Sequence, residues 1–188
     1  GSTHVSFAER RPKEAKAGEA RVAVVSLSPS EDAPVNVSQE VVDKYKARTA
    51  GELERFIRRA AQGGTRMVVT PEFSTVGYPS LGGSPEDDEF QNRAQIRPYV
   101  ETDNGPTAKR FGALARELGI WLIIGIAEDG GKSYYNTSLV FNPKGQLETK
   151  YRKINLFEGE TAFLSPGKER VFFDTDFGRV GVSTCFDI

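Results

Sequence analysis

The amino-acid sequence predicts an α/β protein built around a mixed β-sheet. Short apolar runs rich in β-branched residues first alternate with two segments of helical spacing, and five further strand-like runs then follow one another. The predicted order of elements is therefore β-α-β-α-β-β-β-β-β. With 188 residues, the chain has a length that suits one domain.

The predicted elements begin after a polar N-terminal segment, residues 1–20. This segment opens with Gly-Ser and carries few large apolar side chains, so we interpret it as a tag remnant and a flexible tail. Residues 21–27 have the pattern of a buried strand. Apolar positions at helical spacing then run through residues 38–62, where Gly51 is a candidate break and glycines 63–64 predict the end of the helix.

A second buried strand, residues 67–70, leads into a long segment without regular periodicity, residues 74–105. A loop of this length inside a compact domain is usually functional or mobile. A second helix is predicted at residues 107–118. Five strands complete the predicted fold, at residues 121–126, 134–141, 146–152, 170–173 and 179–184.

The charge and hydropathy of the chain exclude several classes of partner. With 25 Lys and Arg residues against 26 Asp and Glu, the net charge is −1, so no basic surface points to a nucleic acid. No apolar run reaches the roughly 18 residues that a membrane-spanning helix needs, and no signal-peptide pattern opens the sequence. We therefore expect a cytoplasmic protein that binds neither nucleic acids nor membranes.

Histidine and cysteine are each present once, which limits the possible catalytic chemistry. His4 lies in the leading tag remnant, and Cys185 has no second cysteine with which to form an intrachain disulfide. A Ser-His-Asp triad, a Cys-His pair and metal sites built from histidine or several cysteines are therefore unavailable. Any proton transfer must use carboxylates, lysine or tyrosine.

One short motif, Gly131-Lys132-Ser133, invites interpretation as a phosphate-binding loop. That motif requires a glycine at position 126, which is isoleucine here, and a helix directly after it, whereas Tyr134 opens a strand pattern. We therefore interpret the motif as a turn and reject a nucleotide site.

Three chemically capable side chains, Glu72, Lys153 and Cys185, each follow the end of a different predicted strand. Taken singly, each has a more ordinary interpretation: a solvated carboxylate, a surface lysine and a buried small apolar side chain. Alternation from Leu147 nevertheless places Lys153 on the apolar face of its strand, where it needs a carboxylate partner. Together the three can perform acyl transfer, with the carboxylate as base, the thiol as nucleophile and the lysine as oxyanion stabiliser.

The context of these three residues resembles the nitrilase, or carbon–nitrogen hydrolase, superfamily, whose signature is a glutamate, a lysine and a cysteine in that order. The matching stretches are residues 68–73 around the glutamate, 151–160 around the lysine and 178–187 around the cysteine. Within the superfamily, residues 150–160 and 173–188 look most like the biotinidase and vanin (pantetheinase) branch. The chain ends just after the cysteine motif.

The resemblance implies a fold and a reaction. The expected fold is a nitrilase-like four-layer α-β-β-α sandwich, of which residues 21–188 supply the N-terminal portion. The expected reaction is hydrolysis of non-peptide carbon–nitrogen (amide) bonds through a cysteine thioester. Carried over to this sequence, Glu72 is the general base, Cys185 the nucleophile, and Lys153 with the backbone N–H of Phe186 the oxyanion stabilisers.

Two further assignments follow from the same resemblance and from loop length. Glu160 is the expected second carboxylate that orients the lysine and the substrate, although Glu158 is close enough to compete for that role. The long loop from Ser74 to Val100, which contains Tyr78, is the candidate substrate-facing lid.

The resemblance also implies partners and leaves one alternative function open. We expect a small-molecule amide substrate, no metal or organic cofactor, and a homo-oligomer. We also expect the remaining C-terminal half of the domain to be supplied by further chain or by a partner chain, the 188 residues being a cleavage product, a truncated form or a natural remnant. The alternative is a catalytically silent nitrilase-like fragment that serves as a binding or assembly module.

Overall fold

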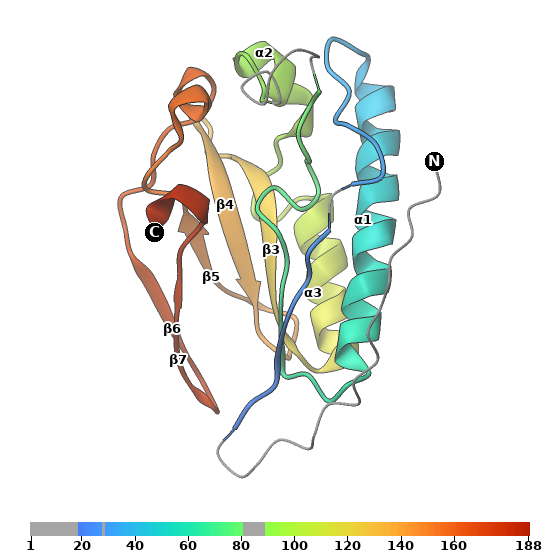
Figure 1. Cartoon of the computed structure of the whole chain (residues 1–188), viewed down its shortest axis with the longest axis vertical. Helices are drawn as coiled ribbons and strands as arrows, with labels where there is room; N and C mark the ends of the chain where they lie inside the picture. Colours follow the sequence, from blue (N-terminus) through green and yellow to red (C-terminus); the bar gives the residue numbers. More distant parts are fainter. Residues whose placement is uncertain (1–18, 28, 81–88) are drawn as a thin grey trace.

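The computed structural model describes residues 19–27, 29–80 and 89–188 (Figure 1). Most of the predicted N-terminal tail, residues 1–18, lies outside the described residues. The helices and strands, in chain order, are β1 (Val22–Val24), α1 (Gln39–Ala61), β2 (Met67–Val69), α2 (Arg93–Ile96), α3 (Pro106–Leu118), β3 (Trp121–Asp129), β4 (Tyr134–Phe141), β5 (Leu147–Arg152), β6 (Val171–Thr175) and β7 (Gly178–Val182). Short 3-10 turns lie at η2 (Arg97–Tyr99), η3 (Glu158–Ala162) and η4 (Cys185–Asp187).

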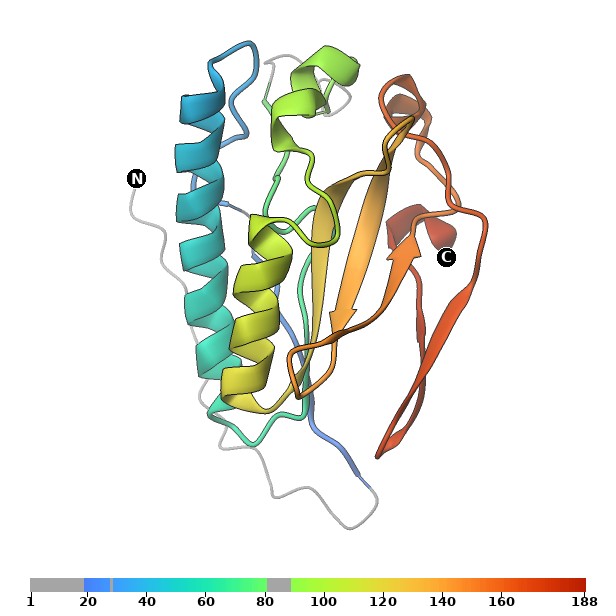
Figure 2. The same cartoon turned by 180° about the vertical axis from the view of Figure 1, so that it is seen from behind.

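The predicted mixed sheet is confirmed. Five strands pair in the order β1-β2-β3-β4-β5, with β1, β2 and β3 parallel and β3, β4 and β5 antiparallel. Helices α1 and α3 lie side by side on one face of this sheet, and the antiparallel hairpin β6–β7 lies on the other (Figures 1 and 2). The described residues thus form a helix layer, a five-stranded sheet and a two-stranded sheet, which confirms the expected α/β, nitrilase-like fold class.

Helix α1 runs without a break through the position where the sequence suggests one. Gly51 was a candidate break, but Ala50 and Leu53 on either side of it are buried against the sheet. The packing of this apolar face therefore outweighs the cost of about 1 kcal/mol that an interior glycine imposes on a helix. The helix ends at the predicted place, with Gly64 in a left-handed conformation (φ 71°).

Strand β3 is buried on both faces and is three residues longer than the sequence predicts. Leu122 and Ile124 belong to the core beneath the helices, whereas Trp121 packs on Phe173 of the hairpin, with ring centroids 5.1 Å apart. The apolar pattern stops at residue 126, yet the strand continues because Glu128 is itself buried and hydrogen-bonded. The motif at residues 131–133 lies in the turn between β3 and β4, as predicted.

The described parts of the segment from residue 74 to residue 105, residues 74–80 and 89–105, are more ordered than the sequence suggests. Residues 89–105 contain α2, which is capped by the Asn92 side chain, and the turn η2. Phe90, Ile96 and Tyr99 are fully buried, and their packing gives residues 89–105 a defined path despite the lack of periodicity. Residues 81–88, the centre of the candidate lid, lie outside the described residues.

None of the helices in the described part of the chain combines the length and the apolar character needed to cross a bilayer.

Candidate active site

Four polar side chains converge at one edge of the sheet because of the way its strands run. Glu72 follows the C-terminal end of β2 and Lys153 that of β5. Strand β4 is antiparallel to β5, so Asn136, near its beginning, lies at the same edge. Cys185 follows β7 in the second sheet and completes the group from the opposite layer.

Lys153 is the centre of this group and is almost completely buried, with 2% of the residue exposed. Its ammonium nitrogen lies 2.8 Å from Glu72 Oε1 and 2.6 Å from Glu160 Oε2. Burial alone would lower the pKa of Lys153, but hydrogen bonds to Glu160 and Glu72 outweigh it and raise the pKa. The lysine is therefore a buried, permanently charged group, and the sequence alternation correctly predicts its burial and its need for a carboxylate.

Asn136 joins the same two carboxylates and was not singled out from the sequence. Its side-chain Nδ2 donates to Glu72 Oε1 at 2.7 Å and to Glu160 Oε1 at 2.9 Å. Lys153 and Asn136 are also neighbours across the strand pair, since the Lys153 N–H donates to the Asn136 carbonyl. The available signal was a lone amide in a strand otherwise rich in apolar and hydroxyl side chains.

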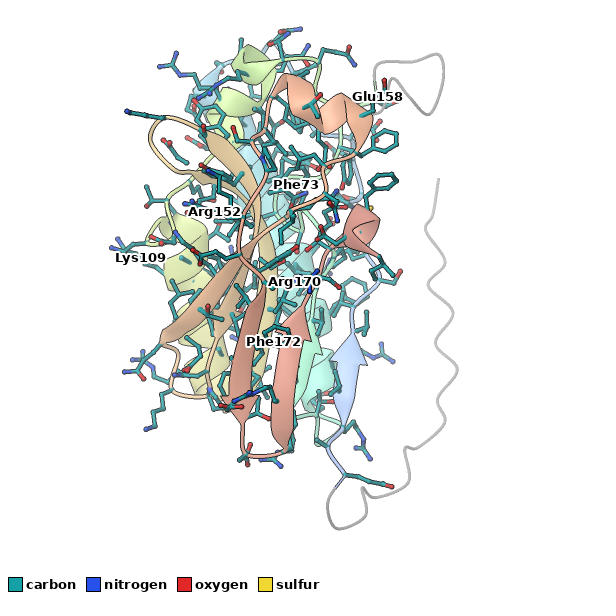
Figure 3. The ribbon with its side chains drawn as sticks, turned by 90° about the vertical axis from the view of Figure 1, so that its left-hand side faces the viewer. Phe73, Lys109, Arg152, Glu158, Arg170 and Phe172 are labelled. Atoms are coloured by element: carbon teal, nitrogen blue, oxygen red, sulfur yellow. The ribbon has the colours of Figure 1, made fainter. Side chains whose placement is uncertain are left out.

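The structure separates the two glutamates that the sequence left in competition. Glu160 is 3% exposed and accepts hydrogen bonds from Lys153 and from the backbone N–H of Phe157. Glu158 is exposed and lies in the turn η3 near the edge of the molecule (Figure 3). Of these two glutamates, only Glu160 contacts Lys153.

Glu72 is held in place by an unusual backbone. Phe73, directly after it, has a left-handed conformation with φ 48°. The backbone from Pro71 to Phe73 passes so close to Gly125 of β3 that a Cβ atom on Gly125 would lie 2.7 Å from Pro71 O and Phe73 N. The hydroxyl of Tyr78, the predicted substrate-facing residue, donates to Glu72 Oε2 at 3.1 Å. This loop aims one carboxylate oxygen at Lys153 and the other at Tyr78.

Cys185 begins the turn η4 and is also left-handed, with φ 48°. The residue as a whole is exposed, although its thiol is partly buried. Burial raises the pKa of the Cys185 thiol, and the negative charge of Glu72 adds to this rise, whereas Lys153 and the N–H of Phe186 act in the opposite direction. The thiol is therefore protonated at neutral pH. The groups that act on its pKa, Glu72, Lys153 and the N–H of Phe186, are the three expected from the sequence.

Comparison with known proteins identifies the family. A family model described as carbon-nitrogen hydrolase matches residues 21–188. The chain belongs to this family. The sequence-based resemblance to the nitrilase superfamily is thus confirmed.

Individual carbon-nitrogen hydrolases extend the comparison. A pantetheinase of Sus scrofa is 34% identical over 188 residues, covering 84% of this chain and 34% of that protein. The omega-amidase NIT2 of Danio rerio is 34% identical over 162 residues, covering 81% of this chain and 54% of that protein. The structure of Saccharomyces cerevisiae Nit3, a member of branch 10 of the nitrilase superfamily, superposes with a TM-score of 0.61 and 29% identity, covering 89% of this chain and 56% of that one. The chain spans only about a third to somewhat over half of the length of these relatives.

In this member of the family, Asp187 connects the turn that carries Cys185 with the segment that carries Lys153. Its carboxylate accepts the Tyr151 hydroxyl at 2.6 Å and the N–H groups of Asn155 at 2.8 Å, Thr184 at 2.9 Å and Ile154 at 3.2 Å. Burial alone would raise the pKa of Asp187, but these hydrogen bonds hold it below its usual range. The segments that carry Cys185 and Lys153 therefore share one anchor.

A cavity of about 400 Å³ adjoins the site on the Glu72 side. Its lining includes Glu72, Tyr78 and two further acidic residues, Glu31 and Asp32. Within the described residues, no group of three or more His, Cys, Asp or Glu side chains is placed to hold a metal ion.

A second buried ion cluster supports β3, β4 and β5 near this edge of the sheet. Glu128 is 2% exposed and accepts hydrogen bonds from Thr137, Lys150 and Arg152. Burial alone would raise the pKa of Glu128, but its bonds from Arg152, Lys150 and Thr137 lower it to about 2. Arg152, seen in Figure 3, also stacks on Tyr135 with its guanidinium carbon 3.9 Å from the ring centroid.

Proposed function

We propose that this chain carries the catalytic groups of an amidase that hydrolyses non-peptide carbon–nitrogen bonds through a thioester on Cys185. The observation that carries the proposal is the placement of the charged Lys153 between Glu72 and Glu160, with the charge of Glu72 also acting on the Cys185 thiol. Membership of the carbon-nitrogen hydrolase family supports the reaction class.

The geometry suggests how the acylation half-reaction proceeds. Glu72 takes the thiol proton while the Cys185 sulfur bonds to the amide carbon, which generates a tetrahedral oxyanion. An ammonium group has three donors, and Lys153 gives two of them to Glu72 and Glu160, so one N–H is left for the oxyanion. The N–H of Phe186, the residue directly after the nucleophile, is the second donor.

The remaining steps return the site to its starting state. The carbon–nitrogen bond breaks as protonated Glu72 gives its proton to the leaving amine, and a thioester remains. Glu72 then takes a proton from water as the water attacks the thioester, and the thiolate leaves and is reprotonated. Glu160 and Asn136 hold Lys153 and Glu72 in position throughout.

The proposal includes chain beyond these residues, or a partner chain, that covers the open side of the site. Phe157 and Phe186 pack edge to face 6.0 Å apart, yet 42% and 58% of these residues are exposed. Exposed aromatic pairs beside a reactive group commonly mark a contact surface. The greater length of the relatives supports such a covering segment, and a homo-oligomer is one way to supply it.

A single measurement separates an amidase from a silent binding module. The rate at which iodoacetamide alkylates Cys185 is followed against pH for the native chain, Glu72→Gln and the urea-unfolded chain. In a silent module, removal of the Glu72 charge lowers the pKa of the thiol and makes alkylation faster, because more thiolate is present. If Glu72 acts as the base, Glu72→Gln makes alkylation slower at neutral pH.

The expected result is a native rate above that of the unfolded thiol, whose pKa is about 8.5, and a loss of at least about tenfold in Glu72→Gln. Glu158→Gln removes the same charge from an exposed position and serves as the matched control. A faster Glu72→Gln protein would overturn the proposal in favour of the binding module.

A further inference from the structure

A third carboxylate, Glu89, lies beside the turn that carries Glu160 and belongs to a segment that the sequence motifs do not include. Its side chain lies against Gly159, so closely that a Cβ atom on Gly159 would overlap Oε2 of Glu89. Gly159 stands between Glu158 and Glu160 in the turn η3. A side chain at position 159 would displace the Glu89 carboxylate, so this contact requires glycine.

The position of Glu89 is set by its buried neighbour. Phe90 is 1% exposed and packs edge to face on Tyr99, with ring centroids 5.2 Å apart, and on Phe163, at 5.8 Å. Phe163 directly follows η3, the turn that contains Gly159 and Glu160. The aromatic contact therefore packs the segment that carries Glu89 against the turn that carries Glu160. Buried packing thus holds Glu89 beside this turn.

Glu89 lies within the electrostatic field of the catalytic group. Burial raises its pKa, the negative charge of Glu160 raises it further, the ammonium of Lys153 lowers it, and Glu72 raises it. The charges of Glu160, Lys153 and Glu72 thus all act on the Glu89 carboxylate. Glu72 and Glu160 each accept hydrogen bonds from both Lys153 and Asn136, so Glu89 adds a negative charge beyond the pair that the lysine already balances.

The cavity beside Glu72 has the same sign of charge. Glu31 and Asp32 contribute to its walls. The Glu31 carboxylate is paired with Arg48 at 2.5 Å, which leaves Asp32 as the additional negative charge. Asp32 and Glu89 thus each add a negative charge near the site.

We propose that Glu89 is a specificity-determining residue of this site, which selects amide substrates that carry an ammonium or another cationic donor group and disfavours substrates that carry a carboxylate. The inference rests on the proposed function. An unbalanced carboxylate in a partly buried site attracts a cationic group and repels an anionic one, and the two effects together change relative reactivity by about tenfold or more.

The single cysteine of the chain allows this charge preference to be measured without catalysis. The rate of modification of Cys185 is compared for a cationic (trimethylammonium-ethyl) and an anionic (sulfonato-ethyl) methanethiosulfonate, and the ratio is divided by that of the urea-unfolded chain. Both reagents react with the same sulfur, so a change in the pKa of the thiol cancels in the ratio.

The expected result is a cationic preference in the native chain that falls by about threefold or more in Glu89→Gln and further in Glu89→Lys. Gly159→Ala keeps the charge of Glu89 but displaces it, and should lower the preference in the same direction. Glu158→Gln removes an exposed carboxylate from the same turn and should change the ratio less than about 1.5-fold.

Equal ratios in Glu89→Gln and the native chain, or an equal fall in Glu158→Gln, would overturn the proposal. Failure of the proposed function is seen separately, as faster alkylation of Glu72→Gln by iodoacetamide. The ratio of the two charged reagents does not depend on that outcome.

Discussion

The hydroxyl of Tyr151 lies 2.6 Å from Oδ2 of Asp187 and connects the strand that carries the lysine with the turn that carries the cysteine. Tyr151 is two residues before Lys153 and Asp187 two residues after Cys185. The same carboxylate also accepts three backbone N–H groups. The spacing between ammonium and thiol therefore depends on a carboxylate that takes no part in the proposed chemistry.

Replacing this carboxylate should destabilise the fold locally and loosen the site. We expect Asp187→Ala to lower the free energy of unfolding by about 1–3 kcal/mol, because four donors lose their acceptor, and Tyr151→Phe to lower it by about 1 kcal/mol. Urea unfolding followed by circular dichroism measures both. Asp174→Ala removes an exposed carboxylate paired with Arg179 and should leave the free energy of unfolding nearly unchanged. An equal cost for Asp174 and Asp187 would contradict the anchoring role.

Gly125 should tolerate no side chain, since a Cβ atom there would collide with the backbone of Pro71 and Phe73, the residues before and after Glu72. We expect Gly125→Ala to lower the free energy of unfolding by about 1–3 kcal/mol and to displace Glu72, with loss of the Glu72-dependent alkylation of Cys185. Gly51→Ala, inside α1 and without a clash, should instead stabilise the protein by about 0.5–1 kcal/mol. Thermal unfolding of the two variants tests the opposite signs, and the prediction fails if Gly125→Ala is as well tolerated as Gly51→Ala.

Substitution of the two glutamates of η3, Glu160 and Glu158, should have very different effects on the alkylation of Cys185. Glu160→Gln removes one of the two carboxylate charges that hold Lys153 and so disturbs the position of Lys153 and of Glu72, its other partner. We therefore expect the alkylation rate of Cys185 at neutral pH to fall by about tenfold or more. Glu158→Gln should leave this rate within about twofold of the native value, since the side chain is exposed. A larger loss in Glu158→Gln than in Glu160→Gln would show that the wrong carboxylate has been placed beside the lysine.

Glu128 should make the protein sensitive to acid. Its pKa is lowered to about 2 from an ordinary value of 4.5, so the carboxylate contributes its full stability above pH 4.5. This contribution, about 3 kcal/mol, is lost progressively as the pH falls from about 4.5 towards 2. Glu128→Gln should be less stable at neutral pH and should show a flatter decline on acidification, as measured by urea unfolding at a series of pH values. Parallel pH curves for the two proteins would refute this assignment.

Local sequence patterns were sufficient to predict the strands and the residues at their ends. Glu72, Lys153 and Cys185 could be proposed as site residues because the end of a strand is recognisable from apolar periodicity, and strand ends meet at a sheet edge. The contacts of Asn136 depend on the register between β4 and β5, which alternation alone does not specify. The approach of Glu89 to Gly159 joins residues seventy positions apart through aromatic packing, and the left-handed backbones of Phe73 and Cys185 follow from tertiary contacts that override local preference.

The burial of Lys153 has a consequence for how the protein folds. Its two carboxylate partners lie 81 and 7 residues away along the chain, and a lone ammonium is too costly to bury. The lysine can therefore leave water at low cost only when β2, β5 and η3 are assembled together. Protection of the Lys153 amine from acylating reagents would therefore report complete folding. A partly folded form in which either carboxylate is out of place would be labelled at Lys153.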